Sequence, residues 1–290
     1  MNNLVIGLDK EFCKKSFIIN RIKKYLNYNI VGDYLRKTDC KYFYIFFNVN
    51  NIFYNGESTK SNIKYIRPFS FLKHSISYKK GNMLYYPYIA EFYLSFGKNL
   101  LKYRNRLDPS PFKNKFLCMI SSNKNKIKKS EGLITALGGL TLYGKYGLET
   151  ISSTEADAYD YVHDSAIKTH SMHSASFIAE NQLDFGYVTE KILLCLYGNS
   201  VPIYLGTDIS NIIKSDYYIS YYHYFTLTEV EKKLLIESKY QNILKADNFF
   251  TEDFNKYLDF IKYDFLVKSN FSDAKKISQM YRDKFVIYNE

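Results

Sequence analysis

The fold class is set by residues 176–206, SFIAENQLDFGYVTEKILLCLYGNSVPIYLG. The apolar piece over residues 177–179 predicts a short buried strand, and Val201–Leu205 predicts a second one. Between them we expect a helix that is capped by Thr189 and ends at Gly198-Asn199. A strand–turn–helix–strand unit of this kind is typical of one half of a nucleotide-binding α/β layer, in which ligands lie at the carboxyl ends of the strands.

The segments before this unit also alternate between strand and helix patterns. Apolar runs of strand length lie at residues 4–8, 29–31, 42–49 and 51–54, and helical spacing occurs at residues 10–25 and 89–103. Because strands that alternate with helices usually form parallel sheets, we expect a parallel α/β layer in this part of the chain as well.

A segment with two prolines, RNRLDPSPF at residues 104–112, is the best candidate for a linker. We therefore divide the chain into a first domain at residues 1–107, a second at residues 108–265 and a helical tail at residues 266–290. The remaining expected elements are a strand at residues 115–121, a strand-like segment at 216–225, and helices at 229–244, 249–267 and 274–286.

The composition indicates a folded protein without a membrane-spanning segment. A chain of 290 residues can bury a large core, and a hydrophobic fraction of 46% excludes wholesale disorder. The net charge of +11 suits nucleic acid, anionic membranes or phosphate-bearing substrates, although lysines scattered among Asn and Tyr are typical of a solvated surface. No signal peptide is recognised and no apolar run reaches the roughly 20 residues that cross a bilayer. We expect a cytoplasmic protein that associates with a membrane, if at all, peripherally.

The cysteines and histidines do not predict a metal or redox site. The four cysteines contain no CxxC pair and are interpreted as reduced, buried thiols of a cytosolic protein. They are Cys13, Cys40, Cys118 and Cys195. Three of the five histidines lie in a polar, mostly helical segment at residues 153–175 and are interpreted as surface residues. They are His163, His170 and His173.

Two polar segments follow predicted strands and are candidates for chemistry. Glu57, in the segment FYNGES at residues 53–58, comes at a strand's carboxyl end, where a carboxylate can act as a general base or remain a solvated loop residue. The lysine-rich segment SNKNKIKKS, residues 122–130, also follows a strand. It is either a phosphate site or a solvated basic turn, and local evidence favours the turn.

Two motifs together resemble the α-1,3/1,4-fucosyltransferase family, which is glycosyltransferase family 10. FYNGES is similar to that family's F-Y-T-G-E-N segment. The residues AEN, YVTEK and SVPIYLG within residues 179–206 resemble its donor-site signature, and the intervening pair Ser122-Asn123 resembles its S-N segment. The resemblance is strong over residues 110–210, weak but ordered over residues 40–100, and slight elsewhere.

The resemblance implies a GT-B architecture, in which two Rossmann-like domains face each other across a cleft. It also implies transfer of L-fucose from GDP-β-L-fucose, with inversion, to a hydroxyl of a glycan acceptor through an α-1,3 or α-1,4 linkage to N-acetylglucosamine. The expected partners are GDP-fucose and an oligosaccharide or glycoconjugate, as in protein glycosylation or other glycan biosynthesis, and nucleic acid is not expected.

Carried over by residue, the resemblance makes Glu57 the general base. It implies that seven further residues bind the donor: Ser122, Asn123, Lys128, Asn181, Tyr187, Glu190 and Lys191. Lys191 and Lys128 would stabilise the departing GDP by their charge, although Lys128 stands where the family usually has an arginine, which chelates phosphate oxygens better. Glu190 would bind ribose hydroxyls and Tyr187 the nucleotide. No D-x-D motif occurs in the sequence, so no metal or other cofactor is expected.

Three other interpretations remain open at this stage. The chain could be a GT-B glycosyltransferase that uses another nucleotide sugar, as the Lys128 departure allows. It could be a basic, aromatic-rich nucleic-acid-binding protein, although this would need a continuous basic stripe with stacking aromatics. It could also be a catalytically inactive relative that binds glycans, against which the intact Glu57, Glu190 and Lys191 argue.

Overall fold

The structure is a computed structural model of all 290 residues. It describes residues 2–6, 28–33, 44–47, 53–55, 75–78, 82–85, 87–105, 107, 115–121, 140–143, 158–181 and 187–264. Several predictions fall outside the described residues and are not tested by the structure. They concern the helices at residues 10–25 and 274–286, the thiols Cys13 and Cys40, and the site residues Glu57, Ser122, Asn123 and Lys128.

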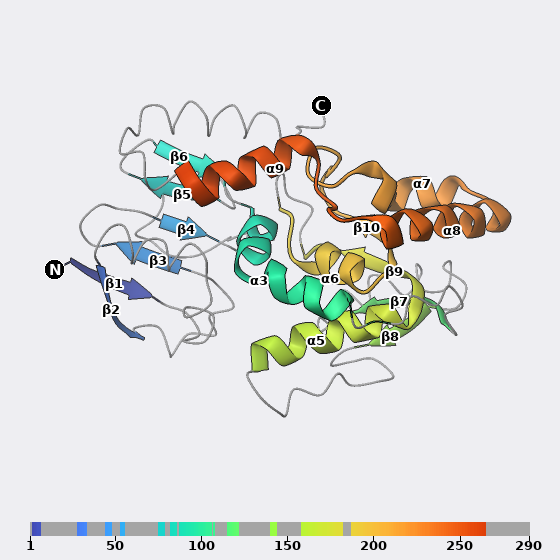
Figure 1. Ribbon diagram of the computed structural model, residues 1–290, viewed down its shortest axis with the longest axis horizontal. Coiled ribbons are helices and arrows are strands. Elements are labelled where there is room, and N and C mark those ends of the chain that lie inside the picture. Colours follow the sequence, from blue (N-terminus) through green and yellow to red (C-terminus); the bar gives the residue numbers. More distant parts are fainter. Residues whose placement is uncertain are drawn as a thin grey trace.

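The first part of the chain forms a six-stranded sheet in the order β2-β1-β3-β4-β5-β6 (Figure 1). Its strands are β1 (Asn2–Ile6), β2 (Tyr28–Asp33), β3 (Tyr44–Phe47), β4 (Phe53–Asn55), β5 (Ser75–Tyr78) and β6 (Asn82–Tyr85). The four strands expected here are present with shifted bounds, but the expected parallel layer is wrong. Only β1 and β2 pair in parallel, and the other four pairings are antiparallel. The connections from β3 to β4 and from β5 to β6 are too short for the crossover that parallel strands need.

The second part forms a five-stranded sheet in which every pairing is parallel. Its strands are β7 (Lys115–Ile120), β8 (Leu140–Tyr143), β9 (His173–Ala179), β10 (Val201–Leu205) and β11 (Ile219–Ser220). Consecutive residues of β10 are buried, and the same holds for the middle of β9. Because successive side chains point to opposite faces, the sheet is covered on both sides, as in other parallel α/β proteins.

The strand order identifies the position in this sheet where a ligand is expected. The order β11-β10-β9-β7-β8 reverses direction between β7 and β9. At such a switch point the connections leave the two strands in opposite directions and open a crevice at their carboxyl ends. The carboxyl end of β9 leads directly into Glu180, and that of β7 leads into Ser121.

Six α-helices are described around the sheets (Figure 1). They are α3 (Tyr88–Arg104), α5 (Ala158–Ser171), α6 (Lys191–Tyr197), α7 (Tyr221–Thr226), α8 (Glu229–Lys245) and α9 (Glu252–Asp259), with a 3-10 turn at Ser215–Tyr217 and a π-turn at Phe260–Asp264. The helices expected at residues 89–103 and 229–244 are confirmed within a few residues. The helix expected at residues 249–267 corresponds to α9 and the π-helix that follows it, and residues 265–267 lie outside the described part of the chain. None of the described helices is both long and apolar enough to cross a membrane.

The strand-like segment expected at residues 216–225 is mostly wrong. Only Ile219–Ser220 is a strand, and α7 follows it directly. The many tyrosines predicted a strand because aromatic residues favour sheets, yet their spacing also fits a helix. Tyr221 and Phe225, four residues apart on α7, pack their rings with centroids 4.6 Å apart.

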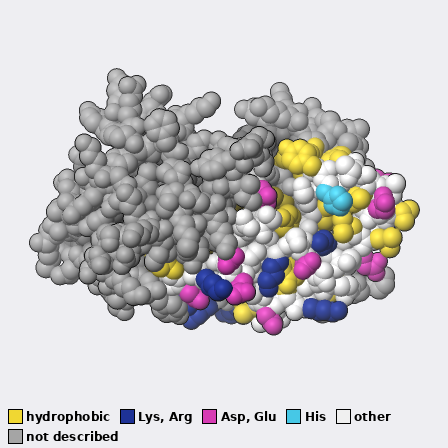
Figure 2. All heavy atoms as spheres, turned by 90° about the horizontal axis from the view of Figure 1, so that it is seen from above, with side chains coloured by type: hydrophobic (Ala, Val, Ile, Leu, Met, Phe, Trp, Pro, Cys, Tyr) yellow, Lys and Arg dark blue, Asp and Glu magenta, His cyan; other side chains and the backbone are white. Residues whose placement is uncertain are grey.

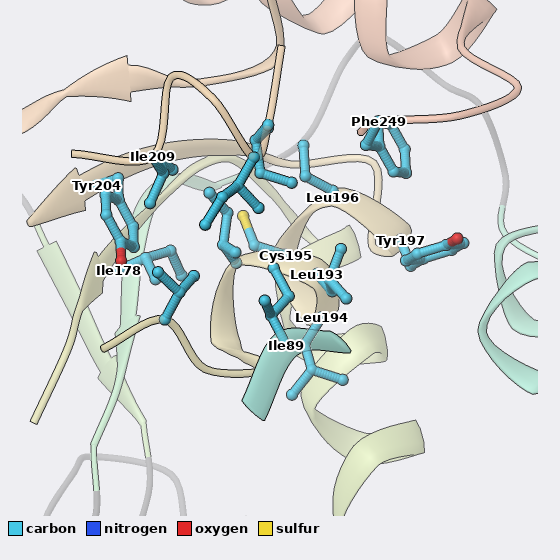
Figure 3. Close-up of a cluster of buried hydrophobic side chains, with 14 of the residues drawn as sticks. Ile89, Ile178, Leu193, Leu194, Cys195, Leu196, Tyr197, Tyr204, Ile209 and Phe249 are labelled. Atoms are coloured by element: carbon cyan, nitrogen blue, oxygen red, sulfur yellow. The ribbon is translucent and has the colours of Figure 1, made fainter. Parts of the chain in front are cut away.

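Helix α6 is the centre of the core. Its residues from Ile192 to Tyr197 are all buried. Figure 3 shows Leu193, Leu194 and Leu196 in a cluster of buried side chains that also includes Ile89 of α3 and Tyr204 of β10. The helix also contacts β9, β10, α3 and α5. Since α3 precedes the boundary expected near residue 108, the core of the second sheet includes a helix from the first part of the chain.

The end of α6 is confirmed, and steric contacts require a glycine there. Gly198 is the C-cap, and a Cβ atom there would lie 2.7 Å from Cβ of His170 and 2.8 Å from the Ile167 carbonyl oxygen. Any other residue would therefore push α5 away from α6. The next residue, Asn199, has φ 51°, a left-handed conformation that turns the chain into β10.

The buried histidines correct the expectation of surface residues. His170 is 3% exposed and His173 is fully buried. Nδ1 of His170 lies 2.9 Å from Oγ of Ser176, and Nδ1 of His173 lies 2.9 Å from the Thr169 carbonyl oxygen. The helix predicted in this segment ends at Ser171 and strand β9 begins at His173, so His170 is buried from α5 and His173 from β9. The side chain of His163 lies outside the described residues.

The two described cysteines are buried thiols, as expected. The Cys118 sulfur lies 3.1 Å from the Ser176 hydroxyl oxygen, and the Cys195 thiol donates to the Ser200 carbonyl oxygen over 3.3 Å. The Ser176 hydroxyl also lies 2.9 Å from the Ser200 hydroxyl. These contacts link β7, β9 and the start of β10 through small polar groups that satisfy one another inside the core.

Arg104, the last residue of α3, ties this helix to α8. Its guanidinium donates to the carbonyl oxygens of Ala246 over 2.7 Å, Ile243 over 2.5 Å and Leu244 over 3.3 Å. These carbonyls lie at the end of α8, where helical backbone acceptors lack partners within the helix. The guanidinium also donates to Oδ1 of Asn199 over 3.1 Å. The first residue of the expected linker is therefore an anchor.

We predict that Arg104→Lys lowers the free energy of unfolding by about 1–3 kcal/mol, because an ammonium cannot reproduce the planar fork that serves several carbonyls at once. Urea denaturation of the two proteins measures the difference. The exposed Lys102 on the same helix provides the matched control, Lys102→Arg, which should change stability by less than about 0.5 kcal/mol. An equally small effect of Arg104→Lys would contradict the anchoring role.

Candidate functional site

The candidate site lies where β9 ends and α6 begins. Glu180 and Asn181 follow β9, and residues 187–190 lead into α6. The backbone N–H of Glu180 donates to the Leu205 carbonyl oxygen over 2.9 Å, which extends the pairing with β10 by one residue. The Val188 carbonyl oxygen accepts from the N–H of Ile89 in α3 over 3.1 Å. Both sides of the connection are therefore fixed by backbone hydrogen bonds.

Glu180 is a buried carboxylate surrounded by donors. Its Oε1 accepts from the backbone N–H of Thr189 over 2.9 Å and from the Tyr204 hydroxyl over 3.4 Å. Its Oε2 accepts from the Thr189 hydroxyl over 2.8 Å and from the Lys191 ammonium over 3.4 Å. A buried charge is stable only when it is paired and hydrogen-bonded, and this carboxylate meets both conditions.

Lys191 bridges the two sides of the site. Its ammonium donates to the Ala179 carbonyl oxygen over 3.2 Å and to Oδ1 of Asn181 over 3.0 Å, in addition to the contact with Glu180. The Lys191 side chain remains 26% exposed, whereas that of Glu180 is fully buried. The arrangement presents a positive charge to solvent at the carboxyl end of β9, which is suited to binding an anion.

The expected cap of α6 is wrong. The N-cap is Glu190, one residue after Thr189, and no side chain caps the helix. Thr189 is buried, and its hydroxyl and N–H both donate to Glu180 instead. Because a charged acceptor forms a stronger hydrogen bond than a neutral one, both donors of Thr189 bind the Glu180 carboxylate.

Glu190 is a second carboxylate next to this network. Burial is the main cause that raises its pKa above the ordinary value, and the charge of Glu180 acts in the same direction. The positive charge of Lys191 and a hydrogen bond from the backbone of Glu190 oppose the rise. The environment therefore favours the protonated form of Glu190 more than water does.

Four of the expected donor-binding residues lie in the described part of the site, and they differ in how far they are exposed to solvent. Asn181 is exposed, Lys191 and Glu190 are partly exposed, and Tyr187 is only 1% exposed. The ring of Tyr187 is therefore enclosed by protein in this conformation. Ser121, the last described residue after β7, is buried, and its N–H donates to the Tyr143 carbonyl oxygen over 2.9 Å.

The four remaining candidates, Glu57, Ser122, Asn123 and Lys128, lie outside the described residues. In the part of the chain that is described, no group of three His, Cys, Asp or Glu residues could hold a metal ion.

Glu180 belongs to the candidate site but is not among the residues that the sequence predicts for it. The signal that could have identified it is its position, because a carboxylate placed directly after a buried strand has few options other than pairing. The lysine of YVTEK then provides a partner of opposite charge at the start of the next helix.

Charged side chains are mixed on the molecular face that Figure 2 shows. Over the described part of this face, Lys and Arg side chains alternate with Asp and Glu, and hydrophobic side chains gather beside an exposed histidine. A continuous basic stripe, which nonspecific nucleic-acid binding requires, does not occur in the described part of this face.

Solved structures of α1,3-fucosyltransferases are among those similar to this chain. The structure with GDP has a TM-score of 0.53 at 15% identity and covers 92% of this chain and 91% of that one. Two others, one of them with GDP-fucose, have TM-scores of 0.40 and 0.38 at 20% and 19% identity. In these two the match spans about half of the fucosyltransferase, 49%, and 56% of this chain. No protein-family model and no curated protein matches. At these identities the likeness shows a fucosyltransferase-like α/β fold.

We predict that Glu190→Gln is more stable than the wild-type protein at neutral pH. A carboxyl whose pKa is raised by folding stabilises the protein fully below its unfolded pKa of about 4.3, and this contribution is lost as pH rises through the folded pKa. The advantage of the variant should therefore appear above about pH 4 and grow until Glu190 is ionised. Each 1 kcal/mol corresponds to a rise in Tm of about 2–4 °C.

Thermal unfolding between pH 4 and pH 8 measures this difference. Glu237→Gln, at an exposed position on α8, is the control and should follow the wild-type curve. A Glu190→Gln variant that loses stability relative to the wild type as pH rises would show that the carboxylate is favourably paired in the folded protein.

Proposed function

We propose that the chain is an inverting fucosyltransferase that transfers L-fucose from GDP-β-L-fucose to a hydroxyl of a glycan acceptor. The observation that carries this proposal is the Lys191 ammonium, held beside the buried Glu180 at the carboxyl end of β9. It lies next to the switch point of a doubly wound sheet, where nucleotides bind in such folds. The fucosyltransferase-like fold and the motif resemblance support the choice of donor.

The proposed reaction is a single displacement at C1 of the fucose. Glu57 accepts the proton of the acceptor hydroxyl as its oxygen forms a bond to C1. The bond from C1 to the phosphate oxygen breaks at the same time, and its electron pair leaves with GDP. Attack from the face opposite the leaving group inverts the configuration, which requires the base and the phosphate-binding cations to lie on opposite sides of the sugar.

Stabilisation of the leaving group is the task proposed for the lysines. Negative charge grows on the diphosphate as the bond to C1 breaks, so a cation placed there binds the transition state better than the ground state. Lys191 supplies one such charge, and we propose Lys128 as another. With these charges the reaction would need no metal ion.

The other site residues complete the proposed donor site. Glu190 would accept hydrogen bonds from ribose hydroxyls and Asn181 would bind the nucleotide beside Lys191. Tyr187 would contact the nucleotide after a change from its buried position. The acceptor is proposed to be an oligosaccharide or glycoconjugate with N-acetylglucosamine, fucosylated through an α-1,3 or α-1,4 linkage.

A second candidate is a glycosyltransferase that uses another nucleotide sugar. The described contacts of Lys191 favour it, because they provide a charge for a diphosphate but include no group that would distinguish one nucleobase from another. The two candidates differ in the nucleotide that they bind, so a nucleotide panel separates them.

We predict that GDP and GDP-fucose raise Tm by several degrees and that UDP and UDP-sugars do not. A ligand at 100 times its Kd stabilises the folded state by about 2.7 kcal/mol. Lys191→Met should weaken GDP binding on the order of 10–100-fold, because a charged hydrogen bond is lost. Lys233→Met, at an exposed position on α8, is the control. Stabilisation by UDP-sugars alone would replace the first candidate by the second.

We also predict that Glu57→Gln lowers kcat by about 10²–10⁴-fold while GDP binding is retained, since the amide cannot accept the acceptor's proton. Turnover is measured with GDP-fucose and an N-acetylglucosamine-containing oligosaccharide. Glu237→Gln serves again as the control for a neutralised glutamate. If Glu57→Gln keeps near-normal turnover, Glu57 is not the base.

A further inference from the structure

We propose that Glu180 is a positioning residue, whose buried carboxylate holds the Lys191 ammonium in place for the diphosphate. The inference rests on the proposed function only in that it requires a nucleoside diphosphate to bind beside Lys191. It goes further by assigning different roles to two neighbours of the lysine. Lys191 keeps its contact with Glu180 when the nucleotide binds, and it exchanges its contact with Asn181 for one with a phosphate oxygen.

The carboxylate of Glu180 is held in one position by burial and hydrogen bonds. Its side chain has no exposed surface, and its two oxygens accept four hydrogen bonds, two each. This number matches the four acceptor sites of a carboxylate. Three of the donors belong to Thr189 and Tyr204, which are buried themselves. Movement of the carboxylate would break these hydrogen bonds inside the protein, so its position is strongly determined.

Gly206, the residue after β10, makes room for one of these donors. A Cβ atom at Gly206 would overlap the hydroxyl of Tyr204, whose oxygen lies 3.4 Å from Oε1 of Glu180. The glycine therefore allows the Tyr204 ring to lie across the end of β10 and to face β9. The carboxylate is thus held from β10 as well as from the start of α6.

The contacts of Lys191 divide into a buried side and an exposed side. An ammonium has three N–H donors, and Lys191 has three acceptors, Ala179, Glu180 and Asn181. The contacts with the first two acceptors, at the end of β9, are partly buried, whereas Asn181 is exposed. A phosphate oxygen can replace the neutral amide oxygen of Asn181 and forms a stronger, charge-assisted hydrogen bond. The buried contacts need not change.

Electrostatics alone predicts the opposite effect of Glu180. A negative charge 3.4 Å from the ammonium reduces the attraction that Lys191 exerts on an anion, so removal of this charge should strengthen the binding of GDP. If positioning is the larger effect, removal should weaken it. The sign of the change therefore distinguishes a positioning residue from a carboxylate that only neutralises the lysine.

The test is a double-mutant cycle of Glu180→Gln and Lys191→Met, with calorimetric titration of GDP and of guanosine. We expect Glu180→Gln to weaken GDP binding on the order of 10–100-fold and to leave guanosine binding unchanged, because only the diphosphate contacts Lys191. The double variant should bind GDP as Lys191→Met does, within about twofold. Glu237→Gln is the control for an exposed glutamate.

Thr189→Val keeps the inference testable if Glu180→Gln fails to fold. It removes the hydroxyl that donates to Oε2 of Glu180 but keeps the backbone donor and the side-chain shape. We expect GDP binding to weaken by about 3–10-fold, again without a change for guanosine. Unchanged or tighter GDP binding by the Glu180→Gln or Thr189→Val variant would overturn the inference. So would a double variant much weaker than Lys191→Met alone, because Glu180 would then act independently of the lysine.

The same cycle with UDP separates this inference from the proposed function. If the chain binds UDP and not GDP, the fucosyltransferase proposal fails while the cycle with UDP still tests Glu180. If GDP binds and Glu180→Gln has no effect, only the positioning role fails. Absence of binding by both nucleotides would overturn both.

Discussion

The buried carboxylate of Glu180 is the constraint on which the described site depends. An ionised group without contact to water must be paired, and here the requirement is met by donors from three directions. The N–H and hydroxyl of Thr189 donate to this carboxylate and do not cap α6. The Tyr204 hydroxyl donates to it from β10, and the Lys191 ammonium donates to it from α6. The shape of the connection between β9 and α6 is therefore largely a consequence of satisfying one charge.

The second sheet was largely predictable from the sequence because its elements are strongly patterned. Val201–Leu205 is an apolar run between turn signals, and α6 is apolar on all sides because it is covered by α3, α5 and the sheet. Both patterns can be recognised in the sequence without knowing which elements pack against them. The helices α3 and α8 were predictable for a related reason, since their apolar residues recur at helical spacing over 17 residues.

The features that were not predictable depend on contacts between distant residues. The antiparallel pairing of β3 with β4 is decided by connection length and by neighbours in space, neither of which periodicity records. His170 is buried because Ser176, six residues later and on another element, accepts or donates beside its ring. Glu180 was overlooked since a glutamate is normally a surface residue, and only Thr189, Tyr204 and Lys191 together make its burial favourable.

The packing of α3 limits how the chain can be divided experimentally. This helix comes before the proline-containing segment, yet it contacts α6, and its last residue, Arg104, binds the end of α8. A fragment that begins at residue 108 would lack Ile89, Phe92 and Phe96, and the part of α6 that contacts α3 would face water. We expect such a fragment to be less stable than one that begins before Tyr88, which would retain this part of the core.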